Sequence, residues 1–117
     1  MAMPDLPEPM RARLAELNAQ PPLETVREFL GGHVADAQNL DEIRARLVRI
    51  AEYSTLLHRR VLGALEAVLA TSWPQDTLAR LVGWDGNWVL DDPSDAGAAQ
   101  FLRDLAQMLR EVIDAAA

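Results

Sequence analysis

The sequence predicts an all-α fold, a helical bundle of about five helices in which residues 1–117 form one domain. Three observations support this prediction. Half of the residues are apolar and only 5% are aromatic, and the apolar set is dominated by Ala and Leu, which are strong helix formers. Apolar residues recur at helical spacing over long stretches. Pro and Gly separate these stretches from one another.

The first third of the chain begins with a Pro-rich segment, residues 1–8, which we expect to be loosely held. Pro9 is suited to open a first helix, and apolar residues follow it at helical spacing. A pair of prolines ends that helix, and the second of them, Pro22, opens the next one. We expect Gly31-Gly32 to end this second helix, because glycine tolerates a left-handed cap.

The middle of the chain carries the longest apolar pattern. Asn39 is a suitable N-cap, and Glu42, three residues later, can complete a capping box. An apolar heptad then runs over Leu40–Val68, and a straight helix over Leu40–Ala70 would span about 45 Å, which is long for so small a domain. The stretch forms either one helix or two, and we expect any kink or break to fall at Tyr53-Ser54-Thr55. Beyond it, residues 56–69 are apolar on more than one side, which predicts a long central helix with neighbours on both flanks.

The last third is predicted to hold two helices separated by a Trp-rich connection. A short helix ends at Gly83. Asp85-Gly86-Asn87 is typical of a tight turn, so the connection forms either a minimal hairpin or an irregular loop. The final helix has the clearest start, with Asp92 as its cap, Pro93 in the first position and Asp95 in the third, where acids interact favourably with the helix dipole.

The net charge of −7 opposes nucleic-acid binding, because such affinity depends largely on Lys and Arg at the phosphates. Residues 23–47 could imitate a helix-turn-helix, but their Arg residues are surrounded by Asp and Glu. An acidic surface instead favours a basic protein partner. No apolar run approaches about 20 residues and no signal-peptide pattern is present, so we expect no membrane span and a cytoplasmic protein.

No catalytic motif is recognisable, since the chain has no Cys, no Gly-rich phosphate loop and no paired-carboxylate signature. Its two histidines, His33 and His58, lie far apart, and we expect His58 to be a surface or boundary residue. The acids from Asp85 onward do not fit a calcium loop, because Leu90 and Ala96 occupy the positions of the invariant Gly and the closing Glu. We therefore expect no catalytic residue, no metal ion and no cofactor.

The three tryptophans fall within one short stretch, in or beside the predicted loops. One interpretation is that they plug the end of the bundle, each burying a large apolar surface. The other is a protein interface with Trp anchors and an acidic rim, and one ring can be buried while another is presented. The candidate partner-binding residues are Trp73, Trp84, Asp85, Asn87, Trp88, Asp91, Asp92 and Asp95.

The leading functional hypothesis is a protein-binding module without catalytic activity that docks a basic partner protein. In size, acidity and lack of catalytic residues the chain resembles the small immunity proteins that neutralise bacterial toxins, which makes an immunity or antitoxin role the most concrete form. An alternative is a structural or regulatory homodimer, joined through the Leu40–Val68 stripe or the last helix. A third is an enzyme or small-ligand binder with a cavity around Tyr53 and His58.

Overall fold

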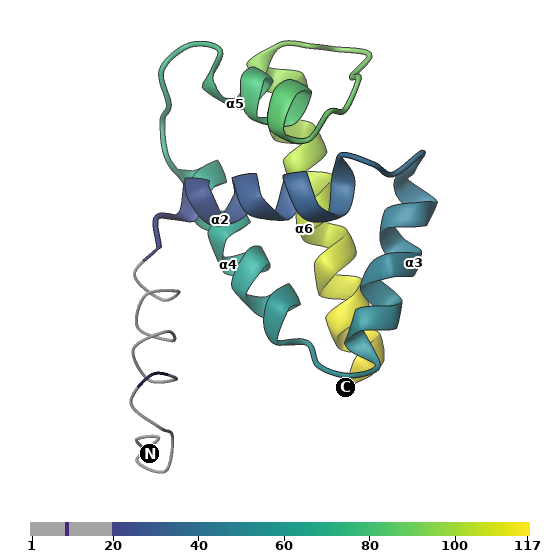
Figure 1. The fold of residues 1–117 in the computed structure, drawn as a ribbon. Coiled ribbons are helices and arrows are strands. Elements are labelled where there is room, and N and C mark those ends of the chain that lie inside the picture. Colours follow the sequence, from purple (N-terminus) through teal and green to yellow (C-terminus); the bar gives the residue numbers. More distant parts are fainter. Residues whose placement is uncertain (1–8, 10–19) are drawn as a thin grey trace.

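The computed structural model describes Pro9 and residues 20–117 (Figure 1). Within this part of the chain all regular elements are helical, which confirms the all-α prediction. The elements are α2 (Pro22–Phe29), η1 (Leu30–Val34), α3 (Leu40–Ala51), α4 (Leu56–Ala70), α5 (Thr77–Arg80), η2 (Leu81–Asp85) and α6 (Asp95–Ala116), where η denotes a π-helical segment. The predicted loose segment at residues 1–8 and most of the predicted first helix lie outside the described residues.

The described helices share one hydrophobic core. As predicted, α4 has neighbours on two sides, since it packs against both α2 and α6. The longest helix, α6, packs against α3, α4 and α5 (Figure 1). Leu56, the first residue of α4, is 68% exposed and does not belong to the core. The largest fully buried apolar side chains are Leu30, Ile43, Leu47, Leu65, Leu102, Leu105 and Leu109.

The long apolar stretch forms two helices, and the break lies at the expected place. α3 ends at Ala51 and α4 begins at Leu56, so residues 52–55 form a turn between two separate helices. The predicted cap of α3 is also present, because the side chain of Asn39 accepts a hydrogen bond of 2.9 Å from the backbone N–H of Glu42. The Glu42 carboxylate does not complete the capping box, and instead forms an ion pair with Arg46 at 2.9 Å.

The prediction that glycines end two of the helices is wrong. α2 continues through Gly31 and Gly32 as η1, and α5 continues through Gly83 as η2, and no described glycine has a positive φ. The two π-helical segments contact each other, and a Cβ built on Gly31 would lie 3.9 Å from the carbonyl oxygen of Asp85. The backbone therefore stays helical in η1 and η2, where the two segments pack together. Neither segment ends in a left-handed cap at its glycine.

The connection between η2 and α6 is irregular, so the hairpin alternative does not form in the described chain. The predicted cap of α6 is wrong by two residues. Ser94 caps the helix by accepting a hydrogen bond of 3.3 Å from the N–H of Gly97. Asp92 lies two residues before Ser94 and accepts bonds from the hydroxyl and N–H of Ser94, at 2.6 and 3.1 Å. The Asp92 carboxylate thus holds the capping residue in place.

Candidate functional site

The structure separates the three tryptophans into two that are packed and one that is presented. Trp73 is half-buried and donates its indole N–H to the carbonyl oxygen of Val68 at 2.8 Å. Trp88 is half-buried and stacks on Phe101 of α6, with ring centroids 5.1 Å apart. Trp84 is 84% exposed. The packing interpretation therefore describes Trp73 and Trp88, whereas Trp84 is exposed and is the ring that remains a candidate anchor.

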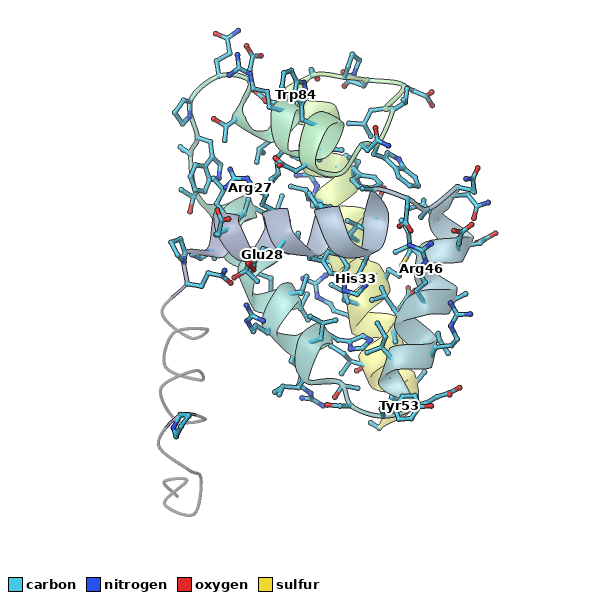
Figure 2. All side chains as sticks on the ribbon, viewed as in Figure 1. Arg27, Glu28, His33, Arg46, Tyr53 and Trp84 are labelled. Carbon is cyan, nitrogen blue, oxygen red and sulfur yellow. The ribbon has the colours of Figure 1, made fainter. Side chains whose placement is uncertain are left out.

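Trp84 projects from a firmly attached segment. It belongs to η2, whose Leu81 and Val82 are both buried in the core. The N–H of Trp88 donates to the carbonyl oxygen of Val82 at 3.2 Å, which folds the following loop back onto η2. Figure 2 shows the Trp84 side chain at the end of the molecule that carries α5 and η2. π-helical turns occur frequently at functional sites in proteins, and this one displays a large aromatic ring to solvent.

Two further predicted site residues fasten this segment to the rest of the bundle. Asp85 lies 3.4 Å from the guanidinium of Arg27 on α2. Asn87 adopts a left-handed backbone conformation with φ of 46° and donates its side-chain amide to the carbonyl oxygen of Ala35 at 3.1 Å. Asn tolerates this conformation better than most residues, which explains its place in the turn. Both side chains therefore position Trp84, and Asp85 stays partly accessible to a partner.

Two acids of the predicted rim, Asp92 and Asp95, have structural roles, because both accept hydrogen bonds from the described chain. The Asp95 carboxylate accepts hydrogen bonds from the backbone N–H groups of Ala79 and Asp76, at 2.9 and 2.7 Å, and these bonds hold its pKa below the usual range. The bonds from the hydroxyl and N–H of Ser94 lower the pKa of Asp92 in the same way. Asp91 is exposed and accepts no hydrogen bond from the described residues, so it is the predicted rim acid that stays open.

The surroundings of Trp84 are acidic and contain a hollow. Residues 71–95 include five acids and a single basic residue, Arg80. A hollow of about 320 Å³ lies between α2 and α5, and its lining includes Leu23, Arg27, Leu81 and Asp85. Arg27 is held between Asp85 and Glu24, and a second guanidinium, that of Arg80, also lines the hollow. The hollow itself is therefore not acidic, and the exposed acid of this connection that accepts no hydrogen bond from the described residues is Asp91, outside the hollow.

The acids of the Trp-rich stretch do not assemble into a metal site. Asp85 pairs with Arg27, Asp92 with Ser94, and Asp95 with backbone N–H groups of α5. No group of three or more His, Asp and Glu side chains among the described residues is placed to hold a metal ion.

The prediction that His58 is a surface or boundary residue is wrong. His58 is fully buried, with Nε2 at 2.8 Å from the carbonyl oxygen of Leu47, whereas Tyr53 is 90% exposed. The position next to two arginines suggested a boundary residue, but the ring points into the core and reaches the backbone of α3 at Leu47. Hydrogen bonding to the carbonyl of Leu47 satisfies one of its two nitrogens.

A small polar hollow does occur beside α2 and α4. It has a volume of about 170 Å³, and its lining includes Glu28, His33 and Arg60. Burial, and then the nearby Arg46 guanidinium, lower the pKa of His33, so the ring is neutral near pH 7. Pockets that hold small-molecule ligands typically measure about 300–1,000 Å³, so this hollow is too small for a substrate of ordinary size.

The apolar stripes proposed as a homodimer seam are largely used within the chain. Ile43, Leu47, Val61 and Val68 are at most 1% exposed and form part of the core. Most of the apolar stripe of α6 is buried in the same core. A second copy could reach these residues only if the bundle opened, which would expose the core to water.

Comparison with family models, with curated proteins and with solved structures returns no match for this chain. None of the described helices combines the length and apolar content needed to cross a membrane. The candidate site is therefore defined by its own geometry, an exposed Trp84 on a firmly attached π-helical segment with acidic neighbours.

Proposed function

We propose that this chain is a protein-binding module that docks a basic partner protein through Trp84 and the acidic residues around it. We name this surface the Trp84 face, and it comprises Trp84, Asp85, Val89 and Asp91. The observation that carries the proposal is the 84% exposure of Trp84 on a segment anchored by Asp85, Asn87 and Trp88. Trp residues that become buried at the centre of an interface commonly dominate its binding energy.

Anchoring of the segment favours binding, because a backbone that is already fixed loses little conformational entropy when a partner binds. The side chain of Trp84 has two rotatable bonds, and the backbone beneath it is fixed by hydrogen bonds and core packing. Val89, 96% exposed in the same connection, adds apolar surface that a partner can cover. A preorganised anchor of this kind lowers the cost of association.

Charge decides the class of partner. The chain carries 18 acids and 11 basic residues, and in residues 71–95 the acids outnumber the basic residues five to one. This field attracts a basic protein and accelerates its encounter at low salt. A second copy of the chain would carry the same charge of −7 and would be repelled, so a basic partner is favoured over a homodimer.

The most concrete form of this proposal is an immunity or antitoxin protein in the bacterial cytoplasm that neutralises a basic toxin. An immunity protein needs no catalytic group, only a surface that covers its target, and the Trp84 face meets that requirement. Co-expression with the product of a neighbouring gene would test this form. Rescue of growth by the wild-type chain, and loss of rescue by Trp84→Ala, is the expected result.

The docking proposal itself is tested by affinity capture at low ionic strength, using the wild-type chain, Trp84→Ala and Tyr53→Ala. Tyr53 is a matched control because it is an equally exposed aromatic at the opposite end of the described bundle (Figure 2). A basic protein retained by the wild type and by Tyr53→Ala, but lost from Trp84→Ala and weakened by salt, supports the proposal. Retention that is equal in all three chains, or no retained protein at all, overturns it.

A further inference from the structure

A groove of two consecutive hollows runs along the seam between α3 and α6, away from the Trp84 face. The first hollow measures about 290 Å³, and its walls include Leu40, Asp41, Arg44, Asp104, Met108 and Glu111. The second measures about 300 Å³, and its walls are Val48, Ala51, Glu52, Val112, Ala115 and Ala116. We refer to these residues together as the α3–α6 groove.

The two hollows follow one another because the helices run side by side in the same direction (Figure 1). On α3, three residues of the lining are spaced one turn apart: Leu40 and Arg44 line the first hollow, and Val48 lines the second. On the other wall, α6 lines the first hollow with residues between 104 and 111 and the second hollow with residues between 112 and 116. The stretch of α3 that lines the groove is about 16 Å long, which is the length of about three turns of a helix laid beside it.

The α3 wall of the groove presents apolar side chains that the described residues leave partly uncovered. Leu40 is 39% exposed and Val48 is 46% exposed. On the opposite wall, Met108 and Val112 are almost completely buried, so they form a closed apolar floor. A stripe of exposed apolar residues one turn apart, over such a floor, matches the way grooves receive the apolar face of an amphipathic helix.

The charges of the groove are predominantly acidic. Its walls carry four acids, Asp41, Glu52, Asp104 and Glu111, and a single basic residue. That residue, Arg44, is already paired with Glu111 at 2.8 Å, and this bond lowers the pKa of Glu111. The remaining acids have exposed positions along the rim of the groove. An occupant with basic residues beside its apolar face is therefore complementary, whereas a second copy of this acidic chain is not.

We propose that the α3–α6 groove binds one amphipathic, basic helix of a partner protein, with its apolar face on Leu40 and Val48 and its basic residues beside Asp41, Asp104 and Glu52. This is a second interaction surface, and it does not depend on docking at the Trp84 face. A module with both surfaces can engage one partner at two points or two partners at once.

The test uses a synthetic amphipathic peptide of about 18 residues, five turns of helix, with Leu at helical i, i+3, i+4 and i+7 spacing and Lys elsewhere. A second peptide with Glu in place of Lys controls for charge. Binding is measured by fluorescence anisotropy with the wild-type chain, Val48→Arg and Ala45→Arg. Ala45 is exposed on the same helix but lines neither hollow, so both variants add the same charge and only one blocks the groove.

We expect the Lys peptide to bind, the Glu peptide to bind at least about tenfold more weakly, and Val48→Arg to weaken binding of the Lys peptide about tenfold more than Ala45→Arg does. Equal weakening by the two variants, equal binding of the two peptides, or no binding of the Lys peptide overturns the proposal. Chemical-shift mapping on the wild-type chain needs no variant, and it should place the peptide on residues 40–52 and 104–116. Shifts centred on Trp84 instead would overturn the groove while leaving the Trp84 face intact.

Discussion

The carboxylate of Asp95, in the first turn of α6, accepts a hydrogen bond of 2.9 Å from the backbone N–H of Ala79 in α5. A second bond, of 2.7 Å, comes from the N–H of Asp76 at the start of the same short helix. The first N–H groups of a helix have no partner within the helix, so they need an acceptor from elsewhere. A side chain from another helix supplies that acceptor here, and it ties α5 and the π-helical segment carrying Trp84 to α6.

We expect Asp95→Asn to destabilise the fold in a pH-dependent way. The pKa of Asp95 is lowered in the folded chain from its ordinary value of 3.8, so its charged form adds stability above that value, and this stability is lost as the pH falls through the lower folded pKa. The difference in unfolding free energy between wild type and Asp95→Asn should therefore be largest near neutral pH and shrink below pH 3.8. Urea denaturation at several pH values measures it.

Asp91→Asn is the matched control for this experiment, because it removes the same charge from the same connection without removing a hydrogen bond to the described residues. It should leave the unfolding free energy close to that of the wild type at every pH. A loss of stability in Asp91→Asn equal to that in Asp95→Asn would show that net charge, and not the cap of α5, is responsible.

Replacement of Trp88 and of Trp84 should separate packing from binding. Trp88→Ala removes the ring stacked on Phe101 and should lower the unfolding free energy by about 2 kcal/mol, less than for a fully buried Trp because Trp88 is only half-buried. Trp84→Ala should change it by no more than about 0.5 kcal/mol, because the exposed ring contributes little to the fold. Urea denaturation followed by far-UV circular dichroism measures both; a Trp84→Ala loss as large as that of Trp88→Ala would contradict the assignment.

His58→Ala should cost about 2–4 kcal/mol of unfolding free energy. The substitution leaves a cavity in the core and removes the side-chain hydrogen bond to the Leu47 carbonyl. Since a carbonyl only accepts, Nε2 of His58 carries the proton and links α4 to the end of α3 across the turn at residues 52–55. His58→Gln retains an N–H donor and should lose less. Thermal and urea denaturation rank the two variants, and a loss below about 1 kcal/mol for His58→Ala would rule out this link as a major contribution.

Two glycine-to-alanine substitutions within helices should have opposite signs. A Cβ on Gly97 would lie 1.9 Å from the backbone oxygen of Asp92, so Gly97→Ala should destabilise the start of α6 by about 2 kcal/mol or more. A Cβ on Gly63, in the middle of α4, would meet no atom within 4 Å, so Gly63→Ala should stabilise the chain by about 0.5–1 kcal/mol. The melting temperatures of the two variants should shift in opposite directions; shifts of the same sign would contradict the close approach at Gly97.

Local chemistry was sufficient to predict several features correctly. The cap at Asn39 was predictable because an N-cap bonds to an N–H only three residues away. The turn between α3 and α4 was predictable because Tyr53-Ser54-Thr55 weakens helix over the same few residues. The cap of α6 was missed by two residues because Asp92 and Ser94 are both good capping residues, and the chain path decides between them.

By itself, the sequence determined the all-α class, the place where the longest apolar stretch breaks and the acidity of the chain, because each depends on residue type or on spacing within a few turns. Only the tertiary structure decided that Trp84 is presented while Trp73 and Trp88 are packed, that Asp95 caps a different helix and that His58 is buried. It also decided that the helices continue past Gly31 and Gly83. These outcomes depend on which segments meet in space, and contacts between residues remote in the chain leave no local signal in residue type or periodicity.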